Sequence, residues 1–489
     1  MRKSCFALAL SCALVSRAYA YDPATTHAGL TQRAVLASSL HKVLTRRLAR
    51  PLGLFEPVVL HAALLPDLER RSLAVRLGAL DPAGGYKIGD DGAAPALAWV
   101  VAGAVIAMTP AERGRNLFYD PSRGTGLGDV STSASFGQSL RALVDGGGFR
   151  DLATGTDFNG TGLPATAWLV SPQNDVGLLA FHDGLEAAVA SAEPAARATA
   201  LARALLALGG SLAILEDAGE PAHVRNDFEG AYLARGRGDS PFDRGSAFER
   251  FVADRYGQVG VPAPAAAVSR PTALAFITAS DSQGLADRTQ RRFFSAGTVP
   301  EDAVVDRDTT TAEVMRDARG SLDYGLPRLP RLELAGLGKK RYASADGRRL
   351  LAYERVPGRV RFFLDDAVYA DTARALLPEI GAYATGLVDH LFRAELIVDV
   401  KADGVAVRVA GARGAVTGRV RVFAEDARGQ RTELGSAPLA AGDDGVSARV
   451  SWATGGMPSG TRRIAATLRG QDAAGELVAV AELAPPTSP

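Results

Sequence analysis

Hydrophobic residues recur three and four positions apart along most of the chain before residue 395. This spacing is typical of α-helices with one buried face. It predicts a helical segment in GLTQRAVLASSLHKVLTRRLARPLG, ended by Pro51 and Gly53. DVGLLAFHDGLEAAVASAEP and PAARATALARALLALGGSLAILEDAG predict an antiparallel helix pair, with Pro194 in the first turn of the second helix. The adjacent Gly209 and Gly210 would weaken that helix, so we expect another backbone to pack closely against them.

The pattern changes near Ala394 to short runs in which apolar and polar residues alternate. ELIVDV, GVAVRVAG, TGRVRVFAED, VSARVSW, RRIAATLRG and LVAVAELA have the period of two that is typical of strands, and turn residues separate them. About seven such strands predict a compact β-sandwich. We therefore expect a mainly α-helical domain at 21–395, followed by a small C-terminal β-sandwich domain at 396–489.

The first twenty residues have the features of a secretory signal peptide. Arg2 and Lys3 precede the apolar run CFALALSCALV, and the small-x-small cleavage site AYA follows at 18–20. The apolar run is too short to span a bilayer. We expect cleavage between Ala20 and Tyr21, and export of the mature protein to the periplasm or the extracellular space.

Composition narrows the choice of partners. The 489 residues are 47% hydrophobic, and 55 basic residues nearly balance 54 acidic ones. Because this balance leaves no concentrated basic face, it argues against binding to duplex nucleic acid. The remaining sequence has no apolar run of about 18 residues free of charges, so it predicts no integral membrane segment. Nothing in the composition specifies an oligomeric state.

The cysteines limit the metal chemistry that the mature chain can offer. Both cysteines, Cys5 and Cys12, lie within the expected signal peptide. Lipid attachment at Cys12 is a less favoured alternative, because Ala9 stands where leucine is usual. After cleavage the chain has no thiol, so any metal must be held by histidine, carboxylate and other nitrogen or oxygen ligands.

The stretch LEDAGEPAHVRND contains two residues of the types that bind metals, Asp217 and His223. Gly219 and Pro221 end the preceding helix and force the chain to turn. His223 can therefore return towards the carboxylate of Asp217. By itself an Asp-x5-His spacing is a weak signal, since a surface pair would have the same spacing.

Four segments, in order, carry a more specific pattern. LGGSLAILEDAGEPAHVRND is similar to a helix-borne His-x3-Asp-x5-His segment, and NLFYDPSRGTGL at 116–127 to a His-Phe-Tyr-Asp-Pro loop. YDPATTHAGLTQRA at 21–34 resembles a mature N-terminus with an aromatic first residue and an early histidine. SAFERFVADRY at 246–256 resembles a segment that supplies a ligand glutamate, here Glu249. Together they resemble the superfamily of zinc-dependent phospholipases C and single-strand-specific nucleases over most of residues 21–395.

The resemblance implies a particular site and chemistry. Enzymes of this superfamily hold three zinc ions with histidines, carboxylates and the free N-terminus, and zinc generates a nucleophilic water near neutral pH. It implies that the Tyr21 amine, His27, Asp217, His223 and Glu249 bind metal, and it places Asp217 at the catalytic centre. A phosphodiester is the substrate that it implies.

Several implied ligand positions carry residues that cannot bind zinc. Ala213 stands four residues before Asp217, where the superfamily has a histidine, and Leu117 stands before the Phe-Tyr-Asp-Pro motif. Met108 replaces an expected acidic residue, and Gly245 replaces a histidine. Among the six histidines of the chain, only two match ligand positions. We expect such a centre to keep one zinc ion or none.

Three functions remain open from the sequence. The first is an exported, divergent member of the superfamily with a degraded metal centre, in which phosphoester hydrolysis is reduced or lost. The second is an active metal-dependent phosphodiesterase that acts on phospholipid or single-stranded nucleic acid with one or two metals. Its substitute ligands would be Glu216, Asp227, Asp239 or Asp243. The third is a surface binding or adhesion protein that acts through its β-sandwich.

Overall fold

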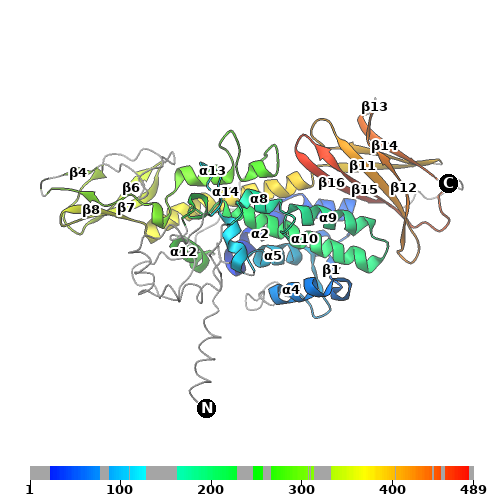
Figure 1. Cartoon of the computed structure of the whole chain (residues 1–489), viewed down its shortest axis with the longest axis horizontal. Helices are drawn as coiled ribbons and strands as arrows, with labels where there is room; N and C mark the ends of the chain where they lie inside the picture. Colours follow the sequence, from blue (N-terminus) through cyan, green and yellow to red (C-terminus); the bar gives the residue numbers. More distant parts are fainter. Residues whose placement is uncertain are drawn as a thin grey trace, which may run out of the picture.

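The computed structural model describes residues 23–77, 88–109, 111–127, 162–227, 246–256, 266–306, 308, 310–312, 332–401, 403–442, 445–452 and 457–483. The expected signal peptide, Tyr21 and Gly245 lie outside these residues. The molecule is elongated, with helices in the middle and strands at both ends (Figure 1).

Helices form the middle of the molecule. They are η1 (Pro23–His27), α2 (Ala28–Ala37), α3 (Leu40–Arg47), η2 (Gly53–Phe55), η3 (Ala62–Leu64), α4 (Asp67–Leu77), α5 (Ala96–Ile106), η5 (Ala111–Leu117), α8 (Ala165–Leu169), α9 (Leu178–Ala190), α10 (Pro194–Asp217), η6 (His223–Arg225), α12 (Ala247–Arg255), η7 (Leu274–Phe276), α13 (Leu285–Arg292), η8 (Ala296–Thr298) and α14 (Asp366–Leu391). Two short strands, β1 (Pro57–Val59) and β2 (Ala93–Pro95), pair between them.

Helix α10 is the centre of the helical core. It packs against α9 and α5, so the predicted helix pair is confirmed, with Pro194 in its first turn. A Cβ atom on Gly209 would lie 1.8 Å from the carbonyl oxygen of Val100, and one on Gly103 would lie 2.0 Å from that of Leu206. The two backbones therefore touch, as the sequence predicted for Gly209. By length and composition α10 could cross a membrane, but 89% of its most apolar window is buried in the protein, as in a core helix.

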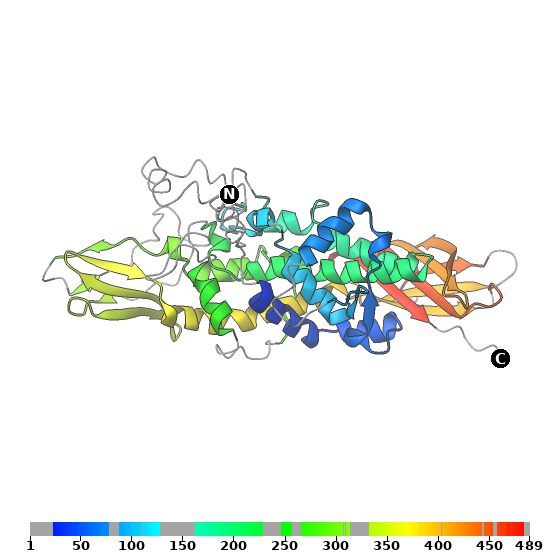
Figure 2. The same cartoon turned by 90° about the horizontal axis from the view of Figure 1, so that it is seen from below.

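A four-stranded antiparallel sheet forms the end of the molecule opposite the C-terminal domain (Figures 1 and 2). Its strands are β3 (Ala303–Val304), β6 (Lys340–Ala345), β7 (Arg348–Val356) and β8 (Arg359–Phe363), in the order β3-β8-β7-β6, and β4 (Thr311–Ala312) pairs with β5 (Leu332–Glu333) nearby. The sequence pattern predicted helices in this region and did not indicate this sheet. In β7 the four residues 350–353 are all buried, so the alternation that marks a half-exposed strand is missing.

Helix α14 connects this sheet to the C-terminal domain. Its N-cap, Asp365, accepts hydrogen bonds from the backbone nitrogens of Ala367 and Val368. The helix packs on β7, α2 and α10. Its 26 residues rise by about 39 Å at 1.5 Å each, and it follows the long axis of the molecule (Figure 2).

The C-terminal domain is a β-sandwich of eight described strands. They are β9 (Glu395–Lys401), β10 (Gly404–Ala410), β11 (Thr417–Glu425), β12 (Arg431–Pro438), β13 (Ala440–Gly442), β14 (Gly445–Ser451), β15 (Arg463–Asp472) and β16 (Gly475–Leu483). They form two antiparallel sheets, β13-β14-β10-β9 and β12-β11-β15-β16, with Val405, Val420 and Leu468 buried between them. A helical domain followed by a small β-sandwich is the architecture that the sequence predicted.

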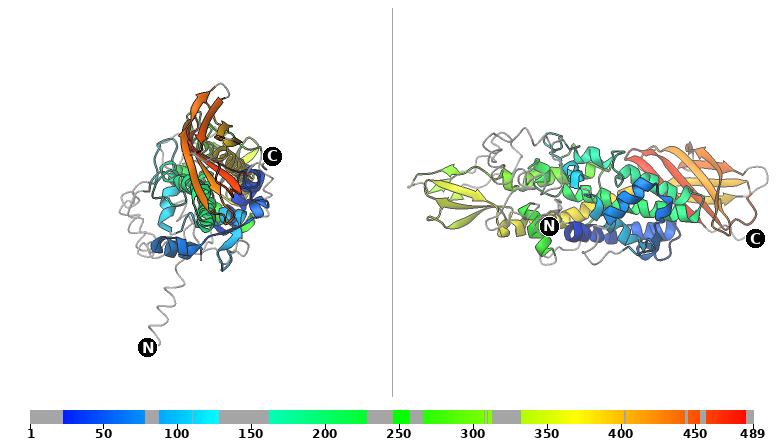
Figure 3. Two further views of the ribbon diagram at one scale, coloured as in Figure 1. Left: turned by 90° about the vertical axis from the view of Figure 1, so that its right-hand side faces the viewer. Right: turned by 60° about the horizontal axis from the view of Figure 1, so that its bottom comes forward.

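The sandwich is packed onto the helices and forms one end of the molecule (Figure 3). Strands β15 and β16 contact α9, and Phe423, Val478 and Val480 belong to the same hydrophobic core as the helices. Arg431 is buried here; it donates hydrogen bonds to Glu425, to Glu482 and to the carbonyl oxygen of a residue in α9. Helices therefore cover the outer face of this sheet.

Candidate metal centre

The chain turns sharply after α10, and this turn brings the candidate residues together. Asp217 is the last residue of α10, and its carbonyl oxygen accepts a hydrogen bond from the backbone nitrogen of Glu220. A Cβ atom on Gly219 would lie 2.4 Å from Ile380, so a larger residue would displace the turn from α14. The helical turn η6 then begins with His223 and points its side chain back towards α10.

His27 approaches the same place from the N-terminal segment. Its Nε2 atom lies 3.3 Å from Oδ1 of Asp217, and its Nδ1 atom lies 2.6 Å from Oε2 of Glu216. All three side chains are buried. Tyr21, whose amine the resemblance implies as a ligand, lies outside the described residues.

The imidazole of His223 lies between two carboxylates. Its Nδ1 atom is 4.0 Å from Oδ1 of Asp217, and its Nε2 atom is 3.8 Å from Oε1 of Glu249. The ring of Phe118 stacks on it, with 4.4 Å between ring centroids. The structure thus brings His27, Asp217, His223 and Glu249 together from four separate segments.

Glu249 is held by the start of α12. The hydroxyl of the N-cap, Ser246, accepts a hydrogen bond from the backbone nitrogen of Glu249 at 3.0 Å. In return, Oε2 of Glu249 accepts one from the backbone nitrogen of Ser246 at 2.6 Å. This reciprocal capping box occupies one carboxylate oxygen and leaves Oε1 directed at His223.

Sequence reasoning missed one acidic residue, Glu220. Its Oε2 atom accepts hydrogen bonds from the backbone nitrogens of Ala222 and His223, and its Oε1 atom accepts one from the hydroxyl of Ser246. Potential ligand atoms of Glu220, His223 and Glu249 all lie within 4.8 Å of one another, and all three residues are buried. The spacing Glu-x-x-His in the turn, followed by Ser-x-x-Glu at a helix start, was the signal available in the sequence.

Burial dominates the electrostatics of the group. It raises the pKa of Glu220 to about 8, and together with the charge of Glu220 it holds the pKa of Glu249 well above its usual range. It lowers the pKa of His223 to about 4, so this imidazole is neutral near pH 7. Burial also opposes the protonation of His27, but the adjacent carboxylates of Asp217 and Glu216 raise its pKa to about 10.

Several buried polar atoms of this group have no hydrogen-bond partner among the described residues. They are Oδ2 of Asp217, both ring nitrogens of His223 and Oε1 of Glu249, whereas Oδ1 of Asp217 faces Nε2 of His27 at 3.3 Å. Leaving such groups buried without partners costs free energy, typically about 1–3 kcal/mol each and more for charged groups. A divalent cation would satisfy them, because neutral imidazole and carboxylate are its usual protein ligands.

The distances are compatible with zinc. Ligand atoms about 2.0–2.2 Å from a tetrahedral zinc ion lie about 3.3–3.6 Å from one another. The separation of His27 Nε2 from Asp217 Oδ1 falls in this range at 3.3 Å, whereas that of His223 Nε2 from Glu249 Oε1 is slightly wider at 3.8 Å. Small side-chain movements would close the second gap.

The loop with the Phe-Tyr-Asp-Pro motif supports His223. The backbone nitrogen of Tyr119 donates to the carbonyl oxygen of His223 at 3.1 Å. The amide of Gln290, from α13, donates both to Oδ1 of Asp120 at 2.6 Å and to the carbonyl oxygen of Val224 at 2.8 Å. The loop begins with Leu117 and, together with Gln290, fixes the backbone carbonyl groups of His223 and Val224.

Apolar side chains occupy the ligand positions that the resemblance implies to be lost. Ala213, Leu117 and Met108 are all buried in the hydrophobic core, and Gly245 lies outside the described residues. Of the substitute ligands considered from the sequence, Glu216 binds His27, and Oδ2 of Asp227 accepts a hydrogen bond from the backbone nitrogen of Gly297. The other two, at 239 and 243, lie outside the described residues.

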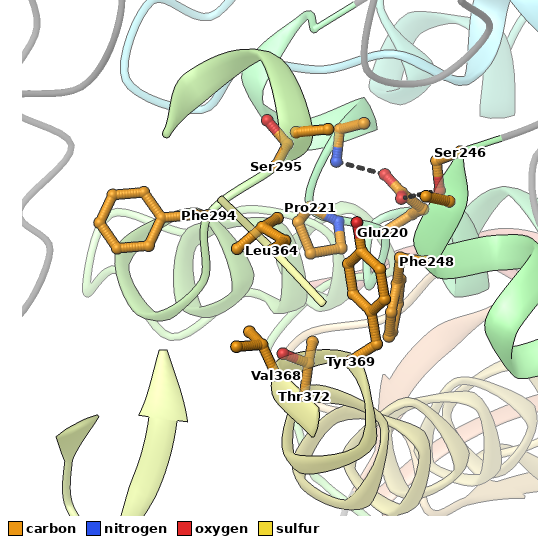
Figure 4. A pocket seen from close by; sticks show the side chains of 13 residues that line it. Glu220, Pro221, Ser246, Phe248, Phe294, Ser295, Leu364, Val368, Tyr369 and Thr372 are labelled. Atoms are coloured by element: carbon orange, nitrogen blue, oxygen red, sulfur yellow. Dashed lines mark hydrogen bonds between the residues drawn. The ribbon is translucent and has the colours of Figure 1, made fainter. Parts of the chain in front are cut away.

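A pocket adjoins the group on the side of Glu220 (Figure 4). Phe248, Phe294 and Tyr369 form much of its wall, and Glu220 and Ser246 lie at one edge, joined by a hydrogen bond. Ser295 and Thr372 add hydroxyl groups. Glu220 is therefore shared between the buried acidic group and the pocket wall.

Comparisons with known proteins do not assign the chain to a family. No family profile matches the chain, and no curated protein does. Among solved structures, the chain aligns with the alpha toxin from Clostridium absonum at 9% identity and a TM-score of 0.29, over 95% of this chain and 99% of that chain. At that TM-score the alignment does not establish a shared fold. The described residues contain a buried group of histidine and acidic side chains that could hold a metal ion.

Proposed function

We propose that this chain is an exported, divergent relative of the zinc-dependent phospholipases C and single-strand-specific nucleases, with a reduced metal centre. Glu220, His223 and Glu249 would hold one zinc ion, and Asp217 with His27 would form an adjoining metal position. When bound, zinc polarises a phosphoryl oxygen or a water molecule. In this chain we expect hydrolysis of phosphodiesters to be weak or lost.

The observation that carries this proposal is the set of buried atoms without partners around His223. Structural zinc sites are closed, whereas catalytic sites keep one coordination position open to substrate. His223 and Asp217 are both fully buried, and Glu220 and Glu249 are nearly so. This closure favours a metal ion that stabilises the fold over one that turns over substrate.

The test combines metal analysis with assays of activity. Mature protein loaded with zinc and dialysed should retain the ion, and the variant His223→Leu should not. Hydrolysis of a chromogenic phosphodiester, phosphatidylcholine vesicles and single-stranded DNA should all be at or near background. About three retained zinc ions with rapid turnover of any of these substrates would overturn the proposal.

The pocket beside Glu220 favours a second candidate, an active phosphodiesterase with one or two metals. Through Glu220 the pocket reaches the acidic group, and its aromatic wall could receive an apolar or aromatic part of a phosphodiester. Zinc-dependent turnover that is lost in Glu220→Gln and lowered in Phe248→Ala would support this candidate over the first.

A further inference from the structure

We infer that Glu216 is a positioning residue that orients His27 for metal binding, and that Thr31 supports it. This inference rests on the proposed function, because it concerns the metal position beside Asp217. Sequence reasoning had considered Glu216 only as a substitute ligand. Both of its carboxylate oxygens are instead occupied by hydrogen bonds to side chains of the N-terminal helix.

The contacts of His27 define which nitrogen faces the acidic group. Its Nδ1 atom lies 2.6 Å from Oε2 of Glu216, and its Nε2 atom lies 3.3 Å from Oδ1 of Asp217. Consecutive residues at the end of α10 project in directions about 100° apart, so their two carboxylates can flank one imidazole ring. A carboxylate on Nδ1 keeps the proton there and makes Nε2 the nitrogen available to a metal ion.

Thr31 fixes Glu216 in turn. Its hydroxyl donates to Oε1 of Glu216 at 2.8 Å. Thr31 follows His27 by four residues, which places both side chains on one face of the helical segment. Glu216, His27 and Thr31 are fully buried, so water does not compete for these hydrogen bonds.

Burying the carboxylate of Glu216 costs free energy of desolvation, which a residue needed only for packing would avoid. Glu216 is buried next to a second buried carboxylate, Asp217, and burial raises its pKa. An apolar side chain at 216 would avoid this desolvation. In metal sites, a carboxylate on the distal nitrogen of a histidine raises the basicity of the ligand, and removing it typically costs about 10–100-fold in metal affinity.

The test measures zinc affinity and the protonation of His27 in the mature protein. Glu216→Ala should weaken zinc binding by about 10–100-fold, and Glu216→Gln, which retains an oxygen acceptor for Nδ1–H, should weaken it less. Glu482→Gln is the matched control, because it neutralises a buried carboxylate in the sandwich interface and should leave zinc affinity unchanged. If Glu216→Ala does not fold, Thr31→Val removes only the supporting hydroxyl and should give a smaller, several-fold loss.

Nitrogen-15 NMR of the histidines gives a readout that a purely structural role would not change. In zinc-loaded wild-type protein, His27 should keep its Nδ1 proton and lose the proton on Nε2. Equal zinc affinity in folded Glu216→Ala, or binding of zinc through Nδ1, would overturn this inference alone. Failure of the wild-type protein to bind zinc would overturn the proposed function, and this inference with it.

Discussion

The Nε2 atom of His223 lies 3.8 Å from Oε1 of Glu249, and neither atom has a hydrogen-bond partner among the described residues. With a pKa lowered to about 4 by burial, His223 is neutral near pH 7 and forms no ion pair with the carboxylate. Two buried polar atoms that face each other without a hydrogen bond are unfavourable, and a cation between them would satisfy both.

Zinc should stabilise the folded protein. A ligand that binds only the native state adds about 2.7 kcal/mol to the free energy of unfolding when its free concentration is 100 times its Kd. Thermal unfolding of zinc-loaded protein should therefore occur at a higher temperature than unfolding in EDTA. The variant Glu249→Gln should lose this difference, because its side chain keeps an oxygen for the capping hydrogen bond but has no carboxylate oxygen to offer zinc. An equal zinc effect in both proteins would point to binding elsewhere.

Replacement of Glu220 should stabilise the metal-free protein and weaken its binding of zinc. Burial raises the pKa of Glu220 to about 8, so Glu220→Gln removes a carboxylate that is costly to ionise in the metal-free protein. That variant should be more stable than wild type in EDTA at pH 8. It should bind zinc at least about 10-fold more weakly, because removing even an outer partner of a metal ligand typically costs that much. Glu379→Gln, at an ion pair with Arg288 and Arg292, is the control for which zinc affinity stays constant. Unchanged zinc affinity in Glu220→Gln would exclude Glu220 as a ligand.

The metal-free protein should lose stability as pH rises above about 6.5. Glu220 releases its proton near pH 4.5 when unfolded and near 8 when folded, so raising the pH through this interval favours unfolding. The pKa of His27 is raised to about 10, so its stabilising effect is complete below pH 6.5 and declines towards 10. The pKa of His223 is lowered to about 4, so its contribution makes stability rise with pH between about 4 and 6.5 and is constant above 6.5. Denaturant titrations in EDTA from pH 6.5 to 8 test this; a rise in stability over that range would contradict it.

Zinc binding should become stronger as the pH rises from 6.5 to 8, because protons and zinc compete for the same ligand atoms. Zinc-saturated protein should therefore show a smaller loss of stability between pH 6.5 and 8 than the metal-free protein. Parallel curves with and without zinc would show that the titrating groups and the metal site are separate.

The β-sandwich should contribute to the stability of the helical domain. Arg431 is buried at the interface and binds Glu425 and Glu482. Arg431→Met removes this partner, although Arg197 still binds Glu425 and Arg463 still binds Glu482. Because each carboxylate keeps one arginine, the loss should fall at or below the low end of the about 3–5 kcal/mol that breaking a buried ion pair costs. Arg449→Met, at the exposed pair with Asp403, should change stability by less than about 1 kcal/mol. Equal losses in the two variants would indicate that the interface adds little.

Local patterns predicted much of the fold. The alternating runs after Ala394 correspond to strands because one face of each sheet is buried in the sandwich. Gly209 marked the close crossing of α10 with α5, and Gly210 a close approach to the backbone of Val176 in the turn before α9, because glycine allows two backbones to touch. The sheet formed by β3 and β6–β8 escaped prediction, since β7 is buried on both faces and has consecutive apolar residues in place of alternation.

The candidate site could be predicted only in part. His27, Asp217, His223 and Glu249 were identified through their resemblance to motifs, and the structure brings them together. Glu220 was missed because its proximity to Glu249 depends on two chain turns whose geometry no spacing rule gives. Glu216 was considered as a ligand, whereas its contacts with His27 and Thr31 show a supporting position.

The most direct measurement is an anomalous difference map at the zinc absorption edge, from crystals of the mature protein grown with zinc. The proposed centre predicts a peak about 2.0–2.2 Å from Nε2 of His223 and from a carboxylate oxygen of Glu249, with Glu220 completing the coordination. A well-ordered map without a peak there, or with zinc bound only at surface residues, would contradict it.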